Sequence, residues 1–383
     1  MKCSIDTNLV HAGDIHPRIG GAVRMPVFQS AMFEHGEHGI RYIRYNNTPN
    51  QQSLNRKLAV LEGTDEALVT GSGMAAISGA LLSVLSPGDH LLAQDGLYGG
   101  THGFATCMLH DLGIEVSFFD ADDPDSWEGL LRPQTRAVYV ESITNPLLQV
   151  CDLERIVDFA TGNGLVSMID NTFATPINYR AAERGFDLSL HSATKYLNGH
   201  SDIVAGAVIG RGDLVRRVDT TLRFLGGPLD PHACFLLDRG LQTLALRVRH
   251  QNESAGRLAS FLEAQPQVTK VNYPGLQSHP RNARATRLFD GCGGMISFEL
   301  GIGVTGAEAF IDRLQIPLHA PSLGGVESLV TRPAMSSHAS LGREERLRVG
   351  IADDLIRMSV GIEAFEDLRA DIAQALSLVE ASA

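Results

Sequence analysis

Short apolar runs separated by helical patterns occupy residues 66–210 of this 383-residue chain. Several runs are uninterrupted, as expected of strands covered on both faces. The runs that we interpret as strands are 66–70, 89–94, 114–120, 137–142, 165–170, 187–192 and 202–210. Between them, 72–85 and 99–113 have helical patterns. The alternation predicts right-handed crossovers and an α/β domain built on a mostly parallel, seven-stranded sheet.

The flanking segments have a different character. Residues 1–46 are rich in Gly, Pro and His and lack a sustained period, so they are either disordered or ordered by packing on something else. Residues 51–63 form a predicted helix that ends at a glycine. A long predicted helix over 234–265 precedes short strands such as 293–300, typical of a smaller α+β domain. We therefore expect an N-terminal arm (1–46), a large domain (47–244) and a small domain (245–383).

The charge balance argues against a polyanionic partner. Lys and Arg number 32 against 44 Asp and Glu, a net charge of −12, whereas nucleic acids and anionic membranes favour a clustered basic face. No apolar run approaches the roughly 18 residues of a membrane span, and the N-terminus lacks the apolar core of a signal peptide. We expect a cytoplasmic protein without nucleic-acid or membrane partners.

The cysteines agree with a reducing compartment. They are odd in number, widely spaced and never arranged as C-x-x-C, at Cys3, Cys107, Cys151, Cys234 and Cys292. This pattern argues against a disulfide framework and against a cysteine zinc site. We predict no metal site, and interpret His191, His200 and His250 as structural.

The predicted strands end in residues that could carry chemistry, and ligands of open parallel sheets bind outside the carboxyl ends of the strands. The first strand leads into Ser72, Gly73 and Met74 at the start of a helix, where unpaired N–H groups suit an anion such as phosphate. A plain tight turn explains these residues equally well. Ala76 replaces the third glycine of a dinucleotide-binding fingerprint.

Other strand ends add an amide, an acid, hydroxyls and an amine. These residues are Asn145, Asp170, Ser192, Thr194 and Lys195. A carboxylate directly after an apolar run needs a buried partner or caps a helix. A lone lysine is ordinarily a surface residue, but this one follows a buried strand and has no acidic neighbour in the sequence.

This combination suggests pyridoxal 5′-phosphate (PLP), which needs a lysine, an anion for its ring nitrogen, a phosphate cradle and often a stacking aromatic ring. Lys195 and Asp170 suit the first two needs, Ser192 and Thr194 with residues 72–74 suit the third, and Tyr98 suits the fourth. The rival interpretations are an NAD-dependent oxidoreductase, which Ala76 disfavours, and a non-catalytic binding protein, which the intact Lys195 disfavours.

At these residues the sequence resembles the Cys/Met-metabolism, or trans-sulfuration, enzymes of PLP fold type I, which include cystathionine γ-synthases, cystathionine γ-lyases, methionine γ-lyases and O-acylhomoserine sulfhydrylases. The motifs VHAG, YIRYNN, SGMAAI, LYGGT, VESITNP, IDNTFATP, HSATKYLNGHSD, RGLQTL, SLGGVESL and LIRMSVGIE occur in family order. The resemblance implies a homotetramer of two catalytic dimers, with the arm ordered by a neighbouring subunit.

The resemblance also implies residue roles. Lys195 would form the Schiff base and carry protons, and Tyr98 would stack on the cofactor and assist as acid or base. Asp170 would pair with the ring nitrogen, and Arg357 would hold the substrate α-carboxylate. The phosphate would be held by Ser72, Gly73, Met74, Ser192 and Thr194, and a neighbouring subunit's phosphate would be reached by Tyr42 and Arg44. Further substrate and cofactor contacts would come from Ser322 and Asn145.

The implied reaction expels a group from the substrate Cγ through quinonoid and vinylglycine-type intermediates. The vinylglycine-type species then collapses to a 2-oxo acid and ammonia, or accepts a new nucleophile. The sequence does not separate γ-elimination from γ-replacement, because both share every step up to that branch.

Four positions depart from the family pattern. Members that act on cystathionine tend to carry an acid, an arginine and a glutamate where this chain has Arg41, Gly103 and Pro321, respectively. In the family these three positions line the distal side of the substrate pocket. Methionine γ-lyases usually carry a cysteine where this chain has Gly100. A misplaced charge in a pocket is costly. We therefore hypothesise a homoserine-type substrate with another Cγ substituent, such as an O-acylhomoserine or canavanine. An ordinary cystathionine γ-lyase or γ-synthase is the alternative.

Overall fold

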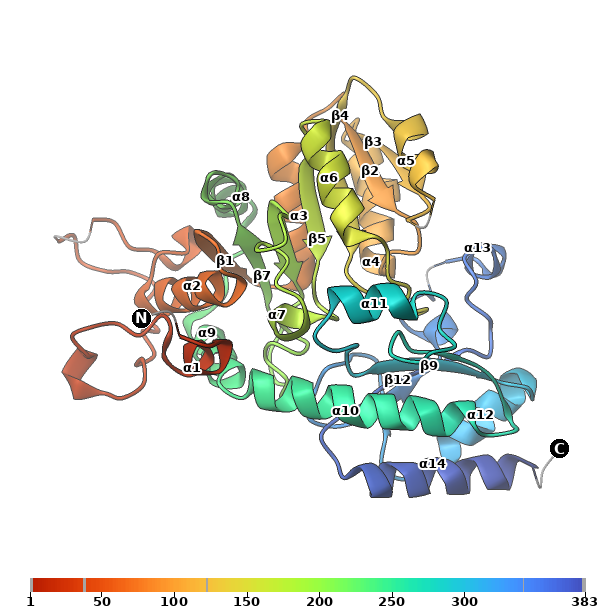
Figure 1. The fold of residues 1–383 in the computed structure, drawn as a ribbon. Helices are drawn as coiled ribbons and strands as arrows, with labels where there is room; N and C mark the ends of the chain where they lie inside the picture. The colour runs from red at the N-terminus through yellow and green to blue at the C-terminus, as the bar shows by residue number, and fades with distance from the viewer. Residues whose placement is uncertain (1–2, 37–38, 122, 340, 381–383) are drawn as a thin grey trace. The chain divides into compact units, whose positions relative to one another are not determined.

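The computed structural model describes residues 3–36, 39–121, 123–339 and 341–380. The chain forms two compact units, which are shown in Figure 1. The large unit comprises Met1–Gln94, Gly103–Ser142 and Asp152–Ala245, and the small unit comprises Asp95–His102, Ile143–Cys151 and Leu246–Ala383. Two short segments from the middle of the sequence thus belong to the small unit.

A seven-stranded sheet forms the centre of the large unit, in the order β1-β7-β6-β5-β4-β2-β3. Its strands are β1 (Glu66–Thr70), β2 (His90–Gln94), β3 (Glu115–Phe119), β4 (Thr135–Glu141), β5 (Val166–Asp170), β6 (Leu188–His191) and β7 (Gly206–Gly210). All neighbours pair in parallel except β7, which is antiparallel to both β1 and β6. The predicted α/β fold with a mostly parallel sheet is confirmed.

Strand β7 is shorter than its predicted run of 202–210. The backbone just before it is already engaged, because Ala205 accepts a hydrogen bond from the N–H of Thr194 and donates its own N–H to the Thr194 hydroxyl. The chain therefore enters the sheet only at Gly206, with its first residues tied to the segment that follows β6.

Helices accompany these strands, and Figure 1 shows α3 and α6 lying along the sheet. They are α1 (Ile5–His11), α2 (Pro49–Glu62), α3 (Gly73–Val84), α4 (Gly99–Gly103), α5 (Pro124–Leu130), α6 (Leu153–Gly162), α7 (Thr175–Asn178), α8 (Gly212–Leu225) and α9 (Pro231–Leu241), with 3₁₀ turns at Ile19–Gly21 and Ile43–Tyr45. The predicted helix over 99–113 is α4 continued by a π-helical turn at Phe104–Leu109.

The segment Asn-Asn-Thr-Pro-Asn at residues 46–50 sets the start of α2. Thr48 is the N-cap of a capping box with Gln51, and Pro49 occupies the first turn. Asn46 adopts a left-handed conformation and donates its side-chain amide to the carbonyl of Val69 in β1, at 2.7 Å. The segment therefore fastens the arm to the sheet while it begins the helix.

The prediction of one helix over 234–265 is wrong, because the chain forms α9 and then α10 (Leu244–Glu263). The interruption lies at Gln242 and Thr243, whose N–H groups bond to the carbonyls of Arg239 and Gly240, three residues back. The Thr243 hydroxyl also donates to the Gly240 carbonyl. These tighter bonds end the α-helical ladder without a proline, so the residue pattern gave no sign of the break.

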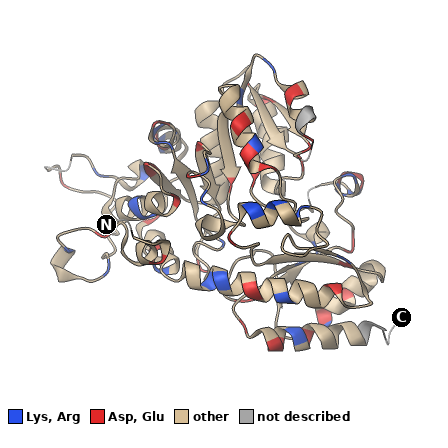
Figure 2. Cartoon of the chain, viewed as in Figure 1, with Lys and Arg blue, Asp and Glu red and all other residues tan. Residues whose placement is uncertain are grey.

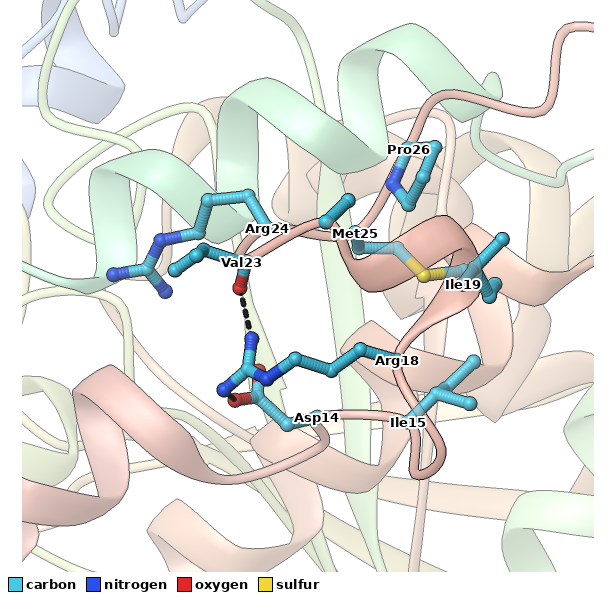
Figure 3. A pocket seen from close by; sticks show the side chains of 9 residues that line it. Asp14, Ile15, Arg18, Ile19, Val23, Arg24, Met25 and Pro26 are labelled. Carbon is cyan, nitrogen blue, oxygen red and sulfur yellow. Dashed lines mark hydrogen bonds and ion pairs between the residues drawn. The ribbon is translucent and has the colours of Figure 1, made fainter.

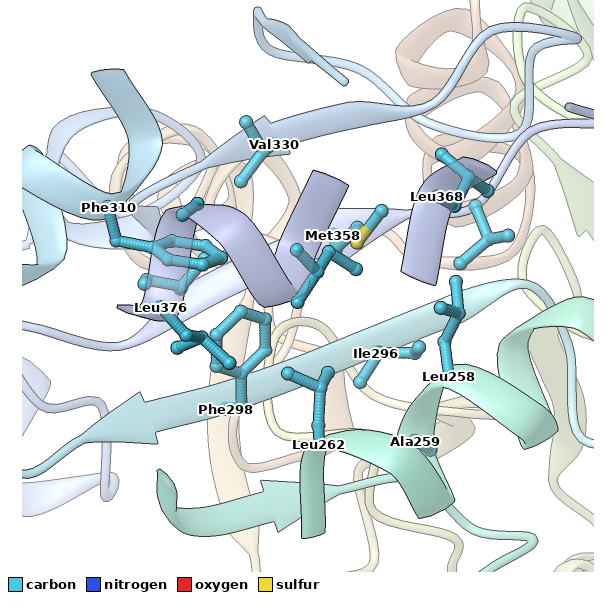
Figure 4. Packing of buried hydrophobic residues seen from close by; sticks show 14 of the residues in the cluster. Leu258, Ala259, Leu262, Ile296, Phe298, Phe310, Val330, Met358, Leu368 and Leu376 are labelled. Atoms are coloured by element: carbon cyan, nitrogen blue, oxygen red, sulfur yellow. The ribbon is translucent and has the colours of Figure 1, made fainter. Parts of the chain in front are cut away.

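The small unit holds a five-stranded sheet in the order β10-β11-β12-β9-β8. Its strands are β8 (Val268–Asn272), β9 (Met295–Leu300), β10 (Leu318–His319), β11 (Leu329–Thr331) and β12 (Ile356–Ser359), and its further helices are α11 (Asn282–Leu288), α12 (Gly303–Arg313), α13 (Arg343–Arg348) and α14 (Phe365–Glu380). Figure 4 shows side chains of α10, α12 and α14 packed on this sheet, with Phe298 and Phe310 edge-to-face at 5.8 Å. This is the predicted α+β domain.

The arm is held by its own contacts and by α2. Figure 3 shows Arg18 pointing at Asp14 and at the carbonyl of Val23, which closes a loop around a small hollow. Farther along, the ammonium of the buried Lys57 bonds to the Leu9 carbonyl of α1 at 3.0 Å and pairs with Asp238 of α9 at 2.5 Å. A single lysine on α2 therefore ties three helices together.

Charges are interspersed on the outer helices, as Figure 2 shows for α10. Within the described part of the chain, no helix combines the length and the apolar character needed to cross a membrane.

We predict that Lys57→Met destabilises the chain by about 3 kcal/mol, because it leaves the Asp238 carboxylate and the Leu9 carbonyl without their cationic partner. Lys270→Met is the matched control, because Lys270 is half-exposed and pairs with Glu299 on the surface. That change should cost less than about 1 kcal/mol. Urea unfolding followed by circular dichroism measures both, and equal shifts for the two variants would contradict the prediction.

Candidate active site

The N-terminus of α3 forms an anion-binding corner in the large unit. Ser72 caps the helix by accepting the N–H of Ala75 at 3.0 Å, and the N–H groups of Gly73 and Met74 find no acceptor among the described residues. A Cβ on Gly73 would lie 2.8 Å from the Cβ of Ser192. Glycine is therefore required where α3 meets the end of β6, and this contact brings two free N–H groups beside the Ser192 hydroxyl.

The two hydroxyls beside Lys195 differ in their surroundings. The Ser192 hydroxyl has no partner within the described chain, so it can turn toward a ligand. The Thr194 hydroxyl donates to the Ala205 carbonyl at 3.1 Å and accepts the Ala205 N–H at 2.9 Å. Thr194 thus anchors the lysine segment to the strand that enters β7.

Asp170 and Ser192 are linked through Thr172. The N–H of Thr172 donates to Asp170 Oδ1 at 2.9 Å, and the N–H of Ser192 donates to the Thr172 hydroxyl at 2.8 Å. Burial raises the pKa of Asp170, while the Thr172 hydrogen bonds and nearby His191 act in the opposite direction. The ends of β5 and β6 are therefore held together as one unit that carries an acid and a hydroxyl.

A tight turn follows Ser192 and carries Lys195. The N–H of Lys195 bonds to the Ser192 carbonyl, and Lys195 in turn accepts the N–H of Gly199 at 2.8 Å. Helix α9 packs closely against this turn. A Cβ on Gly240 of α9 would lie 2.3 Å from the Asn198 carbonyl oxygen, so only a glycine allows this approach. The lysine backbone is therefore fixed by contacts on both sides.

In the small unit, Arg357 of β12 is held as a fork. Its Nη1 donates to Asn145 Oδ1 at 2.9 Å, and its Nη2 donates to the Ser322 carbonyl at 3.1 Å. The side chain is buried, with 3% of its surface exposed. Ser322 has a positive φ of 98°, a strained conformation for a residue with a side chain. The structure thus brings together three predicted substrate residues and orients the guanidinium through neutral oxygens.

His338 is a further residue of the small unit near this fork. Its ring is buried, its Nδ1 contacts the Ser337 hydroxyl at 2.9 Å and its Nε2 lacks a hydrogen-bond partner within the described chain. Burial and the Arg357 charge lower the pKa of His338 to about 4, so the ring is neutral at neutral pH. Tyr98, also in this unit, is half-exposed, and its carbonyl accepts the His102 N–H.

The predicted arm residues lie on the surface of the large unit. The Arg44 guanidinium lies 5.4 Å from the ring centre of Tyr42 and 5.1 Å from that of Tyr45, and it donates to the Arg223 carbonyl at the end of α8. Arg41 is half-buried, and no ion pair involves it within the described chain.

The other two predicted specificity positions are open. Gly103, at the end of α4, has helical φ and ψ of −62° and −39°, and a Cβ there would meet nothing within 4 Å. Pro321 is exposed on the loop of the small unit that leads to Ser322. The missing side chain at Gly103 is therefore not a requirement of packing.

Sequence reasoning missed Thr172 and His338. A hydroxyl two residues beyond the acid at the end of β5 was a usable sign for Thr172, because alternate residues of a strand share a face. For His338 no local sign exists, since its proximity to Arg357 arises only when distant segments pack in the small unit.

Comparison with known proteins decides the family. A family model described as Cys/Met metabolism PLP-dependent enzyme matches residues 6–377. The chain belongs to this family. The cystathionine γ-lyase of Bacillus subtilis is 41% identical over 97% of this chain and 98% of its own length. The cystathionine γ-synthase of Xanthomonas oryzae, solved in complex with cystathionine, has a TM-score of 0.96 and 38% identity, with full coverage of both chains.

A third relative bears on the cofactor. A structure from Campylobacter jejuni, provisionally assigned as an O-acetylhomoserine (thiol)-lyase, contains a pyridoxyl-lysine phosphate. It has a TM-score of 0.94 and 31% identity, and the match covers 98% of this chain and all of that one. The 383-residue chain is accordingly a PLP-dependent lyase or γ-replacing enzyme with fold type I. The free N–H groups of α3 and the Ser192 hydroxyl fit a phosphate, and Asp170 fits a protonated ring nitrogen.

We predict that Gly240→Ala displaces the Lys195 turn and lowers PLP occupancy, because the added methyl would overlap the Asn198 carbonyl. The overpacking should also destabilise the chain by about 1–3 kcal/mol. Gly256→Ala in α10 is the matched control, since its nearest contact would be an ordinary 3.7 Å. Absorbance of the bound cofactor measures occupancy, and full occupancy in Gly240→Ala would refute the proposed support of the turn.

Proposed function

We propose that this enzyme catalyses γ-elimination or γ-replacement on a homoserine-type amino acid whose Cγ substituent is not the cysteine sulfur of cystathionine. The observation that carries the proposal is the state of the three distal positions. Arg41 has no carboxylate partner in the described chain, Gly103 has open space, and Pro321 bears no charge. The acyl group of an O-acylhomoserine meets these conditions, and canavanine is the second candidate.

We assign the cofactor to residues of the large unit, with stacking by Tyr98. PLP, when bound, withdraws electrons from the substrate Cα and makes its proton acidic. Lys195 would hold the cofactor and move the Cα proton. Asp170 would keep the ring nitrogen protonated. The phosphate site would be formed by Ser72, Gly73, Met74, Ser192 and Thr194. Thr194 would contribute indirectly, because its hydroxyl is hydrogen-bonded to Ala205 and anchors the segment.

We assign the α-carboxylate of the substrate to Arg357. A planar guanidinium binds a carboxylate with two parallel hydrogen bonds, and the Asn145 and Ser322 oxygens fix its plane. The neutral His338 beside it adds no competing charge. Arg357→Lys would keep the charge but lose the planar fork.

The alternative is the trans-sulfuration activity itself. The similarity to the Bacillus and Xanthomonas relatives, both cystathionine enzymes, favours it. The distal positions separate the two proposals, because cystathionine carries a second ammonium and carboxylate that need charged partners in a pocket.

We also propose a cytoplasmic homotetramer in which Tyr42 and Arg44 reach a neighbouring subunit's phosphate. Support comes from the exposure of the arm and of Phe224 and Leu225 at the end of α8, 85% and 58% exposed. Apolar side chains of this size, exposed at the end of the helix that Arg44 contacts, are typical of a subunit contact.

We predict that purified wild-type protein has a visible absorption band that Lys195→Ala abolishes, because the amine that holds PLP is lost. Circular dichroism in the far ultraviolet serves as the folding control. A wild-type protein that lacks the band after incubation with PLP would overturn the cofactor site.

We predict that kcat/KM is higher for O-acetylhomoserine, O-succinylhomoserine or canavanine than for cystathionine. Each substrate is assayed with and without an added thiol, which separates elimination from replacement. Gly103→Arg should shift the preference toward cystathionine by about tenfold, the size of one favourable pocket contact. Gly129→Arg, also an open glycine, is the matched control. Cystathionine as the best wild-type substrate would select the alternative function.

A further inference from the structure

A buried carboxylate on α2 collects hydrogen bonds behind the proposed cofactor residues. Glu62 Oε1 accepts the Ser189 hydroxyl at 2.8 Å, lies 3.2 Å from His191 Nε2 and accepts the Asn171 amide at 3.3 Å. Its other oxygen, Oε2, accepts the Ala182 N–H at 3.4 Å. The side chains of Glu62 and His191 are both 0% exposed, so this carboxylate is satisfied entirely by the protein.

The donors come from the two strand ends that carry the cofactor residues. Asn171 directly follows Asp170, and His191 directly precedes Ser192. Successive residues of a strand point to opposite faces, and alternate residues share a face. Ser189, His191 and Asn171 therefore gather on Glu62 on one face, while Asp170 and Ser192 are linked through Thr172 on the other.

The hydrogen bonds determine where the His191 proton lies. Because the Ser189 hydroxyl gives its hydrogen to Glu62, His191 Nε2 must donate, both to Glu62 and to Ser189 at 3.2 Å. The remaining nitrogen, Nδ1, is buried and has no partner within the described chain.

His191 also acts on Asp170 electrostatically, and stabilises its ionised form against burial. Three titratable side chains belong to this cluster: Glu62 from α2, Asp170 from β5 and His191 from β6. His191 therefore favours ionised Asp170, which is the state that would pair with a ring nitrogen.

We propose that Glu62, acting through Asn171, Ser189 and His191, is a positioning residue that holds Asp170 and Ser192 in their PLP-binding arrangement. This inference rests on the proposed roles of Asp170 and Ser192. Glu62 touches no cofactor or substrate, so its removal should alter affinity for PLP through geometry and charge rather than through a lost contact.

The test is titration of full-length apoprotein with PLP, well below the melting temperature measured for each variant. Glu62→Gln should weaken PLP binding by about tenfold, because an amide nitrogen replaces one carboxylate oxygen and cannot accept a hydrogen bond from the surrounding donors. Ser189→Ala, which deletes one oxygen atom, should weaken binding in the same direction by a smaller factor. If Glu62→Gln does not fold, PLP binding by the Ser189→Ala variant tests the inference instead. Glu183→Gln is the control, since Glu183 pairs with Arg180 on the surface of the same unit, and it should bind PLP like the wild type.

The outcomes separate the inference from the proposed site. If Asp170→Asn and Ser192→Ala weaken PLP binding but Glu62→Gln and Ser189→Ala only lower the melting temperature, Glu62 is merely structural and the inference is overturned. If Asp170→Asn and Ser192→Ala also bind PLP like the wild type, the assignment of the cofactor site fails, and the inference fails with it. The titration needs no substrate, so an error in the substrate assignment does not affect it.

Discussion

The close approach of Gly73 to Ser192 is the contact on which the large unit's chemistry depends. It brings the N-terminus of α3 against the end of β6 without an intervening side chain. Two unpaired N–H groups and a hydroxyl then face the same space, so an anion can be bound by groups that have no competing partner. Any side chain at residue 73 would separate these donors.

Near this contact, the ends of β5 and β6 present functional side chains on both faces of the sheet. One face presents Asp170 and Ser192, joined by Thr172. The other presents His191 to the carboxylate of Glu62, deep in the unit. The same short stretches of chain therefore serve cofactor binding and internal support, which explains why so many polar residues can be buried here: nearly every one donates to, or accepts from, another.

The small unit contributes a different kind of preorganisation. Arg357 is aligned by two neutral oxygens, and one of these oxygens belongs to the strained Ser322. Strain of this sort persists only when the surrounding structure holds it. The two hydrogen bonds fix the plane of the guanidinium before any ligand arrives.

The sequence by itself determined the class of fold, the order of strands along the chain, the cofactor and the residues at the strand ends. This was possible because apolar runs, helix starts and strand-terminal residues are local signals. It did not reveal the break between α9 and α10, which depends on hydrogen bonds at Thr243 and not on a breaking residue. Only the tertiary structure decided that Thr194 anchors Ala205, that His338 lies near Arg357, and that Glu62 collects residues from two strands. These relations join positions far apart in the chain, and no local pattern records which side chains the packing will bring together.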